Sequence, residues 1–72
     1  MYIVTIQLGC GWKLVKSHAT YGRALAGLAD RIRAVDAECA VISLPDGTDE
    51  YYDRDGELVL AVMPAELEPV VA

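Results

Sequence analysis

Hydrophobic and polar positions alternate at the start of the chain. In YIVTIQL, residues 2–8, every second side chain from Tyr2 to Leu8 is apolar, which is the period of a half-buried strand. GCG at 9–11 follows as a turn, because its two glycines can take a positive φ. WKLVKS at 12–17 alternates again, so the pattern predicts a β-hairpin as the first element.

The middle of the chain has helical periodicity instead. A helix is predicted from about Thr20 to Asp36, with Ser17 or Thr20 as its N-cap. Gly27 falls on the outward side of this helix, where it adds to a flat strip of small residues. The opposite side is a single apolar stripe, typical of a helix that lies on a sheet: Tyr21, Leu25, Leu28, Ile32 and Val35.

Three further strands are predicted after the helix. AVISL at 40–44 is closed by a PDG turn, residues 49–53 form a short polar strand, and RDG at 54–56 is a second turn. ELVLAVM at 57–63 has the most continuous apolar run of the chain. Such a run favours a central position in the sheet or burial on both faces.

The element order is therefore β-β-α-β-β-β. It predicts a small single α+β domain, in which one helix packs on one face of a mainly antiparallel sheet. Residues 1–63 form the domain, and residues 64–72 form a C-terminal tail that is loose or docked on the sheet. The predicted inner face, toward the helix, consists of Val4, Ile6, Leu14, Ile42, Leu58, Leu60 and Val62.

One helix covers one face, so the other face is left with a large apolar surface. A second copy of the chain, another protein or the tail must cover it. Homodimerisation or partner binding is the favoured interpretation, with Val41, Val59, Ala61 and Met63 as contact residues. Ile3 and Val15 lie on the same predicted face.

Composition limits the class of protein. The chain has 72 residues, of which 54% are hydrophobic and 24% charged, as in a single folded domain. The net charge is −5, and it is unevenly distributed. Residues 1–35 carry five Lys or Arg and one acid, whereas residues 36–72 carry ten acids and one Arg. Direct nucleic-acid binding is not expected of such an acidic chain, and a basic protein is the expected partner.

The acids concentrate in DGTDEYYDRDGE, residues 46–57, where six of twelve residues are Asp or Glu. An EF-hand alignment on Gly56 places Tyr51 at position 1 and Val62 at position 12, and neither is a ligand. Two interpretations stay open, a solvated hairpin that blunts a sheet edge and a surface that binds a basic partner. The candidate contact residues are Asp46, Asp49, Glu50, Tyr51, Tyr52, Asp53, Asp55 and Glu57.

No catalytic, cofactor or metal site is predicted. Cys10, Cys39 and His18 could in principle form a nucleophile and base, but no spacing orders them. A core this small leaves little room for a deep pocket. The N-terminus lacks a basic region, and its apolar run is too short for a bilayer. The expectation is a cytoplasmic protein with reduced thiols and no membrane contact.

These observations favour a non-catalytic protein-binding module. Its most specific form is a small acidic inhibitor of a basic, nucleic-acid-handling protein, comparable in size and charge to phage-encoded anti-defence proteins such as anti-CRISPRs. No motif in the chain identifies such a family. The alternatives are a structural subunit that assembles as a homo-oligomer, and a regulatory domain with a small-ligand pocket around Trp12 and Tyr21.

Overall fold

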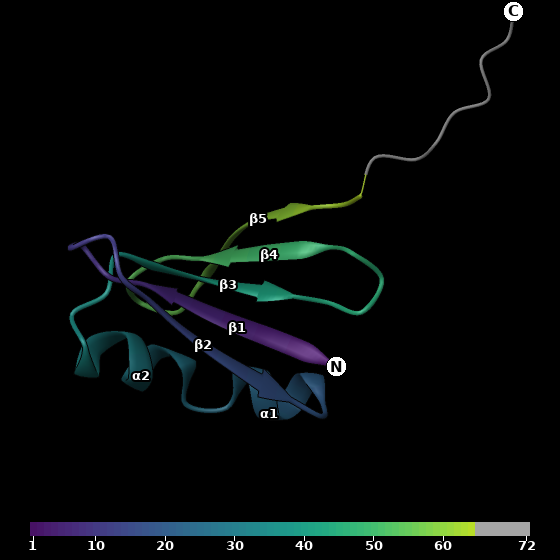
Figure 1. Cartoon of the computed structure of the whole chain (residues 1–72), viewed down its shortest axis with the longest axis horizontal. Coiled ribbons are helices and arrows are strands. Elements are labelled where there is room, and N and C mark those ends of the chain that lie inside the picture. The colour runs from purple at the N-terminus through teal and green to yellow at the C-terminus, as the bar shows by residue number, and fades with distance from the viewer. Residues whose placement is uncertain (65–72) are drawn as a thin grey trace, which may run out of the picture.

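Five strands form one antiparallel sheet in the computed structural model of the protein, which describes residues 1–64. The sheet order is β2-β1-β3-β4-β5, and every neighbouring pair is antiparallel (Figure 1). The predicted α+β fold with an antiparallel sheet is confirmed. The predicted placement of the tail falls on residues 65–72, outside the described residues. The strands are β1 Tyr2–Gln7, β2 Lys13–His18, β3 Cys39–Ser43, β4 Asp49–Tyr52 and β5 Leu58–Val62.

The helical segment is bent, with two short helices where one continuous helix was predicted. α1 spans Tyr21–Leu25 and α2 spans Leu28–Ala34. The bend lies at Gly27, whose φ of 66° is left-handed, a conformation that glycine takes without steric cost. The prediction that Gly27 lies on an outward helix face is therefore wrong, because it separates the two helices.

Two side chains satisfy the ends of these short helices. Thr20 is the N-cap of α1, as one of the two sequence candidates, and its Oγ1 accepts a hydrogen bond from the backbone N–H of Arg23 at 3.2 Å. At the other end, Nη2 of Arg31 donates to the carbonyl oxygens of Ala24 and Ala26, both at 2.9 Å. Arg31 thus ties α2 to the end of α1 across the bend, where the carbonyls lack partners within the helix.

The core lies between the helices and one face of the sheet. Val4 is opposite Ile42 and Ile6 is opposite Ala40 in the β1–β3 register, so these four side chains point to the same face. Helix residues pack onto these four side chains. Of the predicted apolar stripe, Leu28 and Ile32 are buried, and Tyr21 and Leu25 are partly buried. The buried cluster consists of Val4, Ile6, Ala24, Leu28, Ile32, Ala37, Ala40, Ile42 and Tyr52.

The position of β5 contradicts the sequence prediction. This strand was expected at the centre of the sheet or buried on both faces, but it is an edge strand. All five of its residues are exposed, because the helices lie beside the other side of the sheet, near β2 and β1 (Figure 1). Apolar composition reports how hydrophobic a strand is, but it does not determine which strands are its neighbours.

The register also corrects the predicted facing of β5. Val41 is opposite Tyr51, which is opposite Leu60, so Leu60 lies on the open face. Ala61 is opposite Glu50, and therefore lies on the other face from Val41. The prediction that Ala61 shares the open face is wrong, as are the inward assignments of Leu60 and Val62. A register shift at Tyr51/Tyr52 leaves Val59 without a cross-strand partner.

Candidate functional site

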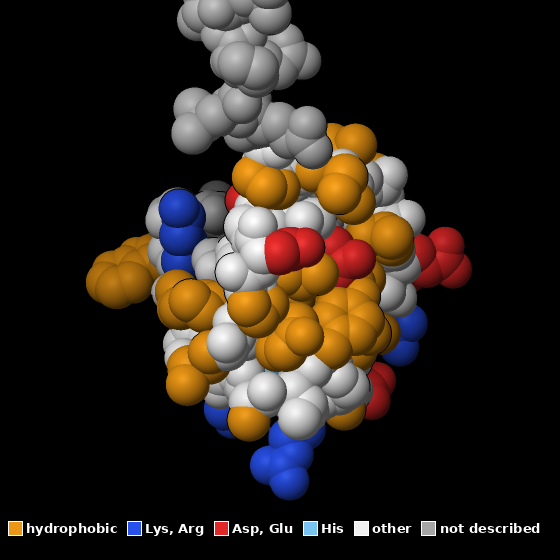
Figure 2. Space-filling model, turned by 90° about the vertical axis from the view of Figure 1, so that its right-hand side faces the viewer, with side chains coloured by type: hydrophobic (Ala, Val, Ile, Leu, Met, Phe, Trp, Pro, Cys, Tyr) orange, Lys and Arg blue, Asp and Glu red, His pale blue; other side chains and the backbone are white. Residues whose placement is uncertain are grey.

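The acidic segment does not form one row of carboxylates. Asp46 lies in the turn before β4, whereas Asp53, Asp55 and Glu57 lie in the connection after it. Figure 2 looks at the end of the molecule that carries the β3–β4 turn, and its acidic side chains lie among hydrophobic and uncharged ones. The eight predicted contact residues are therefore divided between both ends and both faces of β4.

Glu50 and Tyr52 belong to an internal network. Glu50 Oε1 accepts hydrogen bonds from the hydroxyls of Tyr21, at 2.6 Å, and Tyr52, at 3.1 Å, and these two hydroxyls lie 3.1 Å apart. The Tyr52 ring is 5% exposed and part of the core. Its predicted role as contact area for a partner is therefore wrong, and Glu50 links β4 to α1.

The network changes the acidity of both tyrosines. The hydrogen bond to the Glu50 carboxylate raises the pKa of Tyr21, because loss of the hydroxyl proton would break that bond. Burial is the main reason that the pKa of Tyr52 is raised well above 10.0. Both hydroxyls therefore act as donors in the folded protein at neutral pH, and the network is satisfied without an external group.

The acids in the two turns have local structural roles. Asp46 Oδ1 accepts the backbone N–H of Thr48 at 2.8 Å, which lowers the pKa of Asp46. Asp53 Oδ1 accepts the N–H groups of Asp55 and Glu57 at 2.9 and 3.0 Å. Asp commonly stabilises turns in this way. The interpretation as a solvated hairpin therefore accounts for Asp46 and Asp53 without a partner.

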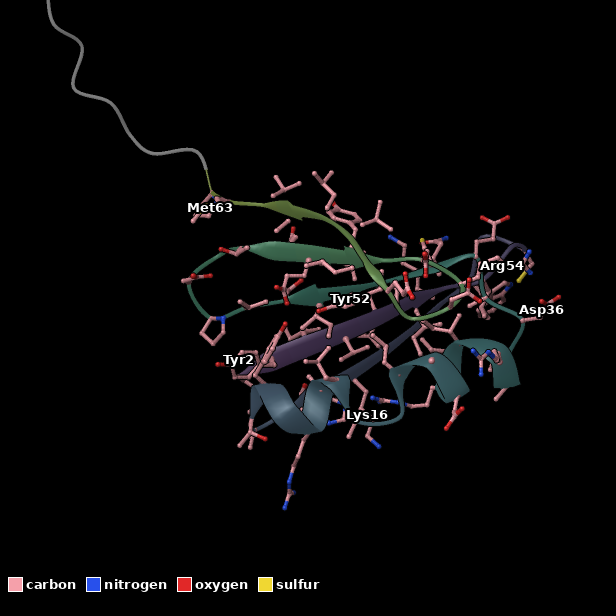
Figure 3. All side chains as sticks on the ribbon, turned by 180° about the vertical axis from the view of Figure 1, so that it is seen from behind. Tyr2, Lys16, Asp36, Tyr52, Arg54 and Met63 are labelled. Carbon is pink, nitrogen blue, oxygen red and sulfur yellow. The ribbon has the colours of Figure 1, made fainter. Side chains whose placement is uncertain are left out.

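The turn between β4 and β5 is anchored on α2. Arg54 forms an ion pair of 2.8 Å with Asp36, which follows α2, and both labelled side chains lie at the same end of the molecule (Figure 3). Gly56 has a φ of 77°, and a Cβ there would lie 2.7 Å from the Cβ of Ala29. The close approach of this turn to the helix requires a glycine, and it fixes where β5 begins.

An exposed apolar surface runs along the edge of the sheet that β5 forms. We name it the β5 edge and define it as residues 58–63. Its large side chains, Leu58, Val59, Leu60, Val62 and Met63, are between 46% and 73% exposed. The segment carries no charged side chain. On the open face it continues into Tyr51 on β4, whereas the exposed Ile3 and Val15 lie farther away, on β1 and β2.

The other sequence candidates do not come together. Trp12 is 73% exposed in the turn before β2, whereas Tyr21 lies beyond the other end of β2 and belongs to the Glu50 network, so the structure does not bring this pair together. Cys10 and Cys39 are free thiols, and His18 contacts Arg31. Within residues 1–64, no three His, Cys, Asp or Glu side chains are grouped to hold a metal ion.

Comparisons with known proteins give no relative for this chain: no protein-family model, curated protein or solved structure matched it. Neither helix within residues 1–64 has the length and apolar character needed to cross a membrane.

Proposed function

We propose that this chain is a non-catalytic protein-interaction module that assembles through the β5 edge, first with a second copy of itself. The observation that carries the proposal is an edge strand with an uncharged apolar sequence, which no other element within residues 1–64 covers on either face. An edge strand presents unpaired N–H and C=O groups, and natural proteins normally protect it with charge, proline or a covering element. The strand from Leu58 to Val62 contains neither charge nor proline, and no element among the described residues covers it.

A second copy is the partner that fits this strand. When two β5 strands pair antiparallel about Leu60, Leu58 of one copy lies opposite Val62 of the other. Leu60 lies opposite its own equivalent. Each cross-strand pair is then apolar, and such pairs stabilise sheets. The contact is isologous, as in most symmetric dimers, and it joins two five-stranded sheets into one continuous sheet. The open face around Tyr51 extends the contact surface.

The test is a charge placed in the middle of the β5 edge. Leu60→Lys puts an ammonium into the proposed strand pair, and we expect the dimer dissociation constant to rise about 100-fold, since a charge is costly to bury unpaired. Val15→Lys is the matched control, because Val15 is similarly exposed but lies on β2, the opposite edge. Sedimentation velocity over a concentration series measures both constants.

Two results would contradict the proposal. One is a wild-type chain that stays monomeric throughout the concentration series. The other is equal weakening by the two variants, which would show that added charge, and not its position on β5, controls association. Thermal unfolding of both variants checks that the exposed lysines leave the fold intact.

A basic protein partner is the second candidate, and one observation favours it. The connection between α2 and β3 meets the turn between β4 and β5 at one end of the sheet, where Arg54 contacts Asp36. Asp55 and Glu57 are exposed at that end, and their side chains have no hydrogen-bond partner among the described residues. Inhibition of a nucleic-acid-handling protein is a specific form of this candidate, supported by size and acidity alone.

The two candidates separate in a capture experiment. The wild-type chain, Leu60→Lys and the double variant Asp55→Asn/Glu57→Gln are each used as bait, and bound proteins are eluted with salt. A basic partner retained by Leu60→Lys but lost by the double variant would support the acidic end. Loss with Leu60→Lys alone would place the contact on the β5 edge.

A further inference from the structure

An apolar groove lies on the side of the molecule away from β5. It runs between β2 and α2 and has a volume of about 370 Å³. Val4 and Ile6 are buried and form its floor, while Leu14 and Val35 are partly exposed and form its walls. Ala34 completes the apolar lining, and Val15, which the register places on the open face, borders the groove at the β2 edge.

Two cations complete the groove, Lys16 from β2 and Arg31 from α2. Lys16 is opposite Val4 in the β1–β2 register, so it lies on the face of the sheet that the helices cover (Figure 3). The Arg31 guanidinium is held in place by the carbonyls of Ala24 and Ala26, and its Nη1 lies 3.3 Å from Nε2 of His18. Arg31 is therefore a positioned cation.

No acid neutralises these two cations within residues 1–64. The ion pairs found there join Asp30 to Arg33 and Asp36 to Arg54, and the oxygens bound to Arg31 are neutral carbonyls. The pKa of His18 is lowered, first by desolvation and then by the positive charges of Arg31, Lys16 and Arg23. His18 is consequently neutral at pH 7, and its free ring nitrogen can accept from Arg31. The rim of the groove thus has uncompensated positive charge.

We infer that this groove binds an amphiphilic anion, a long-chain carboxylate whose hydrocarbon lies on Val4 and Ile6 and whose head group contacts Lys16 and Arg31. The volume is in the range of small-molecule sites, about 300–1,000 Å³, and such sites are mostly apolar with a few oriented polar groups. A guanidinium held in place loses little entropy when it pairs with a carboxylate. Charge complementarity therefore selects an anionic head, and the apolar floor selects the chain.

The test is a titration of the full ¹⁵N-labelled chain with decanoate, followed by amide chemical shifts. We expect saturable shifts that concentrate on residues 14–16 and 34–35. Lys16→Gln should raise the decanoate dissociation constant about tenfold, the loss expected for a charge-assisted contact. Lys13→Gln is the matched control, because this substitution removes the same charge and Lys13, opposite Gln7, lies on the other face of β2. It should leave the constant unchanged.

The neutral analogue 1-decanol tests the head group, and it should bind at least about tenfold more weakly than decanoate. Equal binding of decanoate to Lys16→Gln and Lys13→Gln, equal binding of the alcohol, or shifts that do not saturate would each overturn the inference. Groove shifts that follow protein concentration instead of decanoate would identify a second copy as the occupant and would overturn it as well. None of these results depends on association through β5, which Leu60→Lys tests separately.

Discussion

The two edge strands of the sheet differ in charge more than in exposure. β2 exposes Leu14 and Val15, and β5 exposes Leu60 and Val62 to a similar degree. β2, however, carries Lys13 and Lys16 within six residues, whereas β5 carries no charge. Lysines on an edge strand oppose pairing with another strand. Apolar exposure alone therefore does not mark an assembly surface, and the difference in charge is the reason that we propose β5 for that role.

The same comparison separates two kinds of binding. At the β2 side the helices and the sheet enclose a groove with a cationic rim, which suits a small anionic ligand. At the β5 side no other element within residues 1–64 covers either face, which suits another strand. The groove is built entirely from residues 1–35, which carry the +4 balance, whereas all acids of residues 36–72 lie outside β5 in the sequence.

The largest expected effect concerns the turns that lead into the two edges. Gly11 precedes β2 and Gly56 precedes β5, and both have positive φ. Gly11→Ala should cost about 1–2 kcal/mol from the left-handed backbone alone, since nothing lies within 4 Å of its added Cβ. Gly56→Ala adds a contact of 2.7 Å with Ala29, so we expect about 2–4 kcal/mol in total.

Urea unfolding measures both free energies. Equal losses in the two variants would show that the turn before β5 is not held against α2 in solution. In that event the position of β5, and the assembly surface with it, would need revision.

A smaller effect separates the two neighbouring tyrosines of β4. Tyr52→Phe removes a hydroxyl that donates to Glu50 and contacts Tyr21, and we expect a loss of about 1 kcal/mol in the free energy of unfolding. Tyr51→Phe is the control, because the Tyr51 hydroxyl has no hydrogen bond among the described residues and its ring lies on the open face. It should change stability by less than about 0.5 kcal/mol.

Thermal unfolding of the two phenylalanine variants gives the comparison directly. If Tyr51→Phe were the more destabilising change, the facing of β4 would be the reverse of the one described. The β5 edge would then lie against the helices.

The smallest expected effect is a pH dependence at the β2 side. The pKa of His18 is lowered below 6.5 in the folded protein, so the unfolded chain binds the proton more tightly. Stability is then fully present above about pH 6.5 and falls as the pH decreases through that value toward the folded pKa. The decrease occurs because the charged imidazolium is desolvated in the fold and is also repelled by Arg31.

Urea midpoints between about pH 5 and 7.5 measure this slope, in a range where most carboxylates keep their charge. His18→Gln should flatten it. A midpoint that rises as the pH decreases, or a slope that survives in His18→Gln, would contradict the described environment of this histidine.

Much of the fold could be predicted because its signals are local. The alternation from Tyr2 to Leu8 predicts β1, the two glycines around Cys10 predict the turn, and Thr20 caps α1 as one of two candidates. Each of these depends on the preferences of a few consecutive residues. Glycine weakens a helix, but the left-handed conformation of Gly27 was not predicted; in the fold, Arg31 binds the carbonyls of Ala24 and Ala26 across this bend.

The sites were less predictable, because they depend on neighbours that are distant in sequence. From the sequence, Glu50 and Tyr52 were predicted to belong to an acidic surface. In the fold they form a hydrogen-bond network with Tyr21, which lies 29 residues before Glu50. From the sequence alone, Lys16 is a solvated strand residue. In the fold it lines the same groove as Arg31 of α2. Residues 58–63 are apolar in any arrangement, and their hydrophobicity alone favoured the centre of the sheet.

The sequence by itself determined the elements, their antiparallel character and the charge of each half, because these follow from local periodicity and composition. Only the tertiary structure decided that β5 is an edge strand, that Leu60 and not Ala61 shares the face of Val41, and that the acids of residues 46–57 are divided. The physical reason is that strand order and register arise from packing between distant segments, here the close approach of Gly56 to Ala29 and the shift at Tyr51/Tyr52.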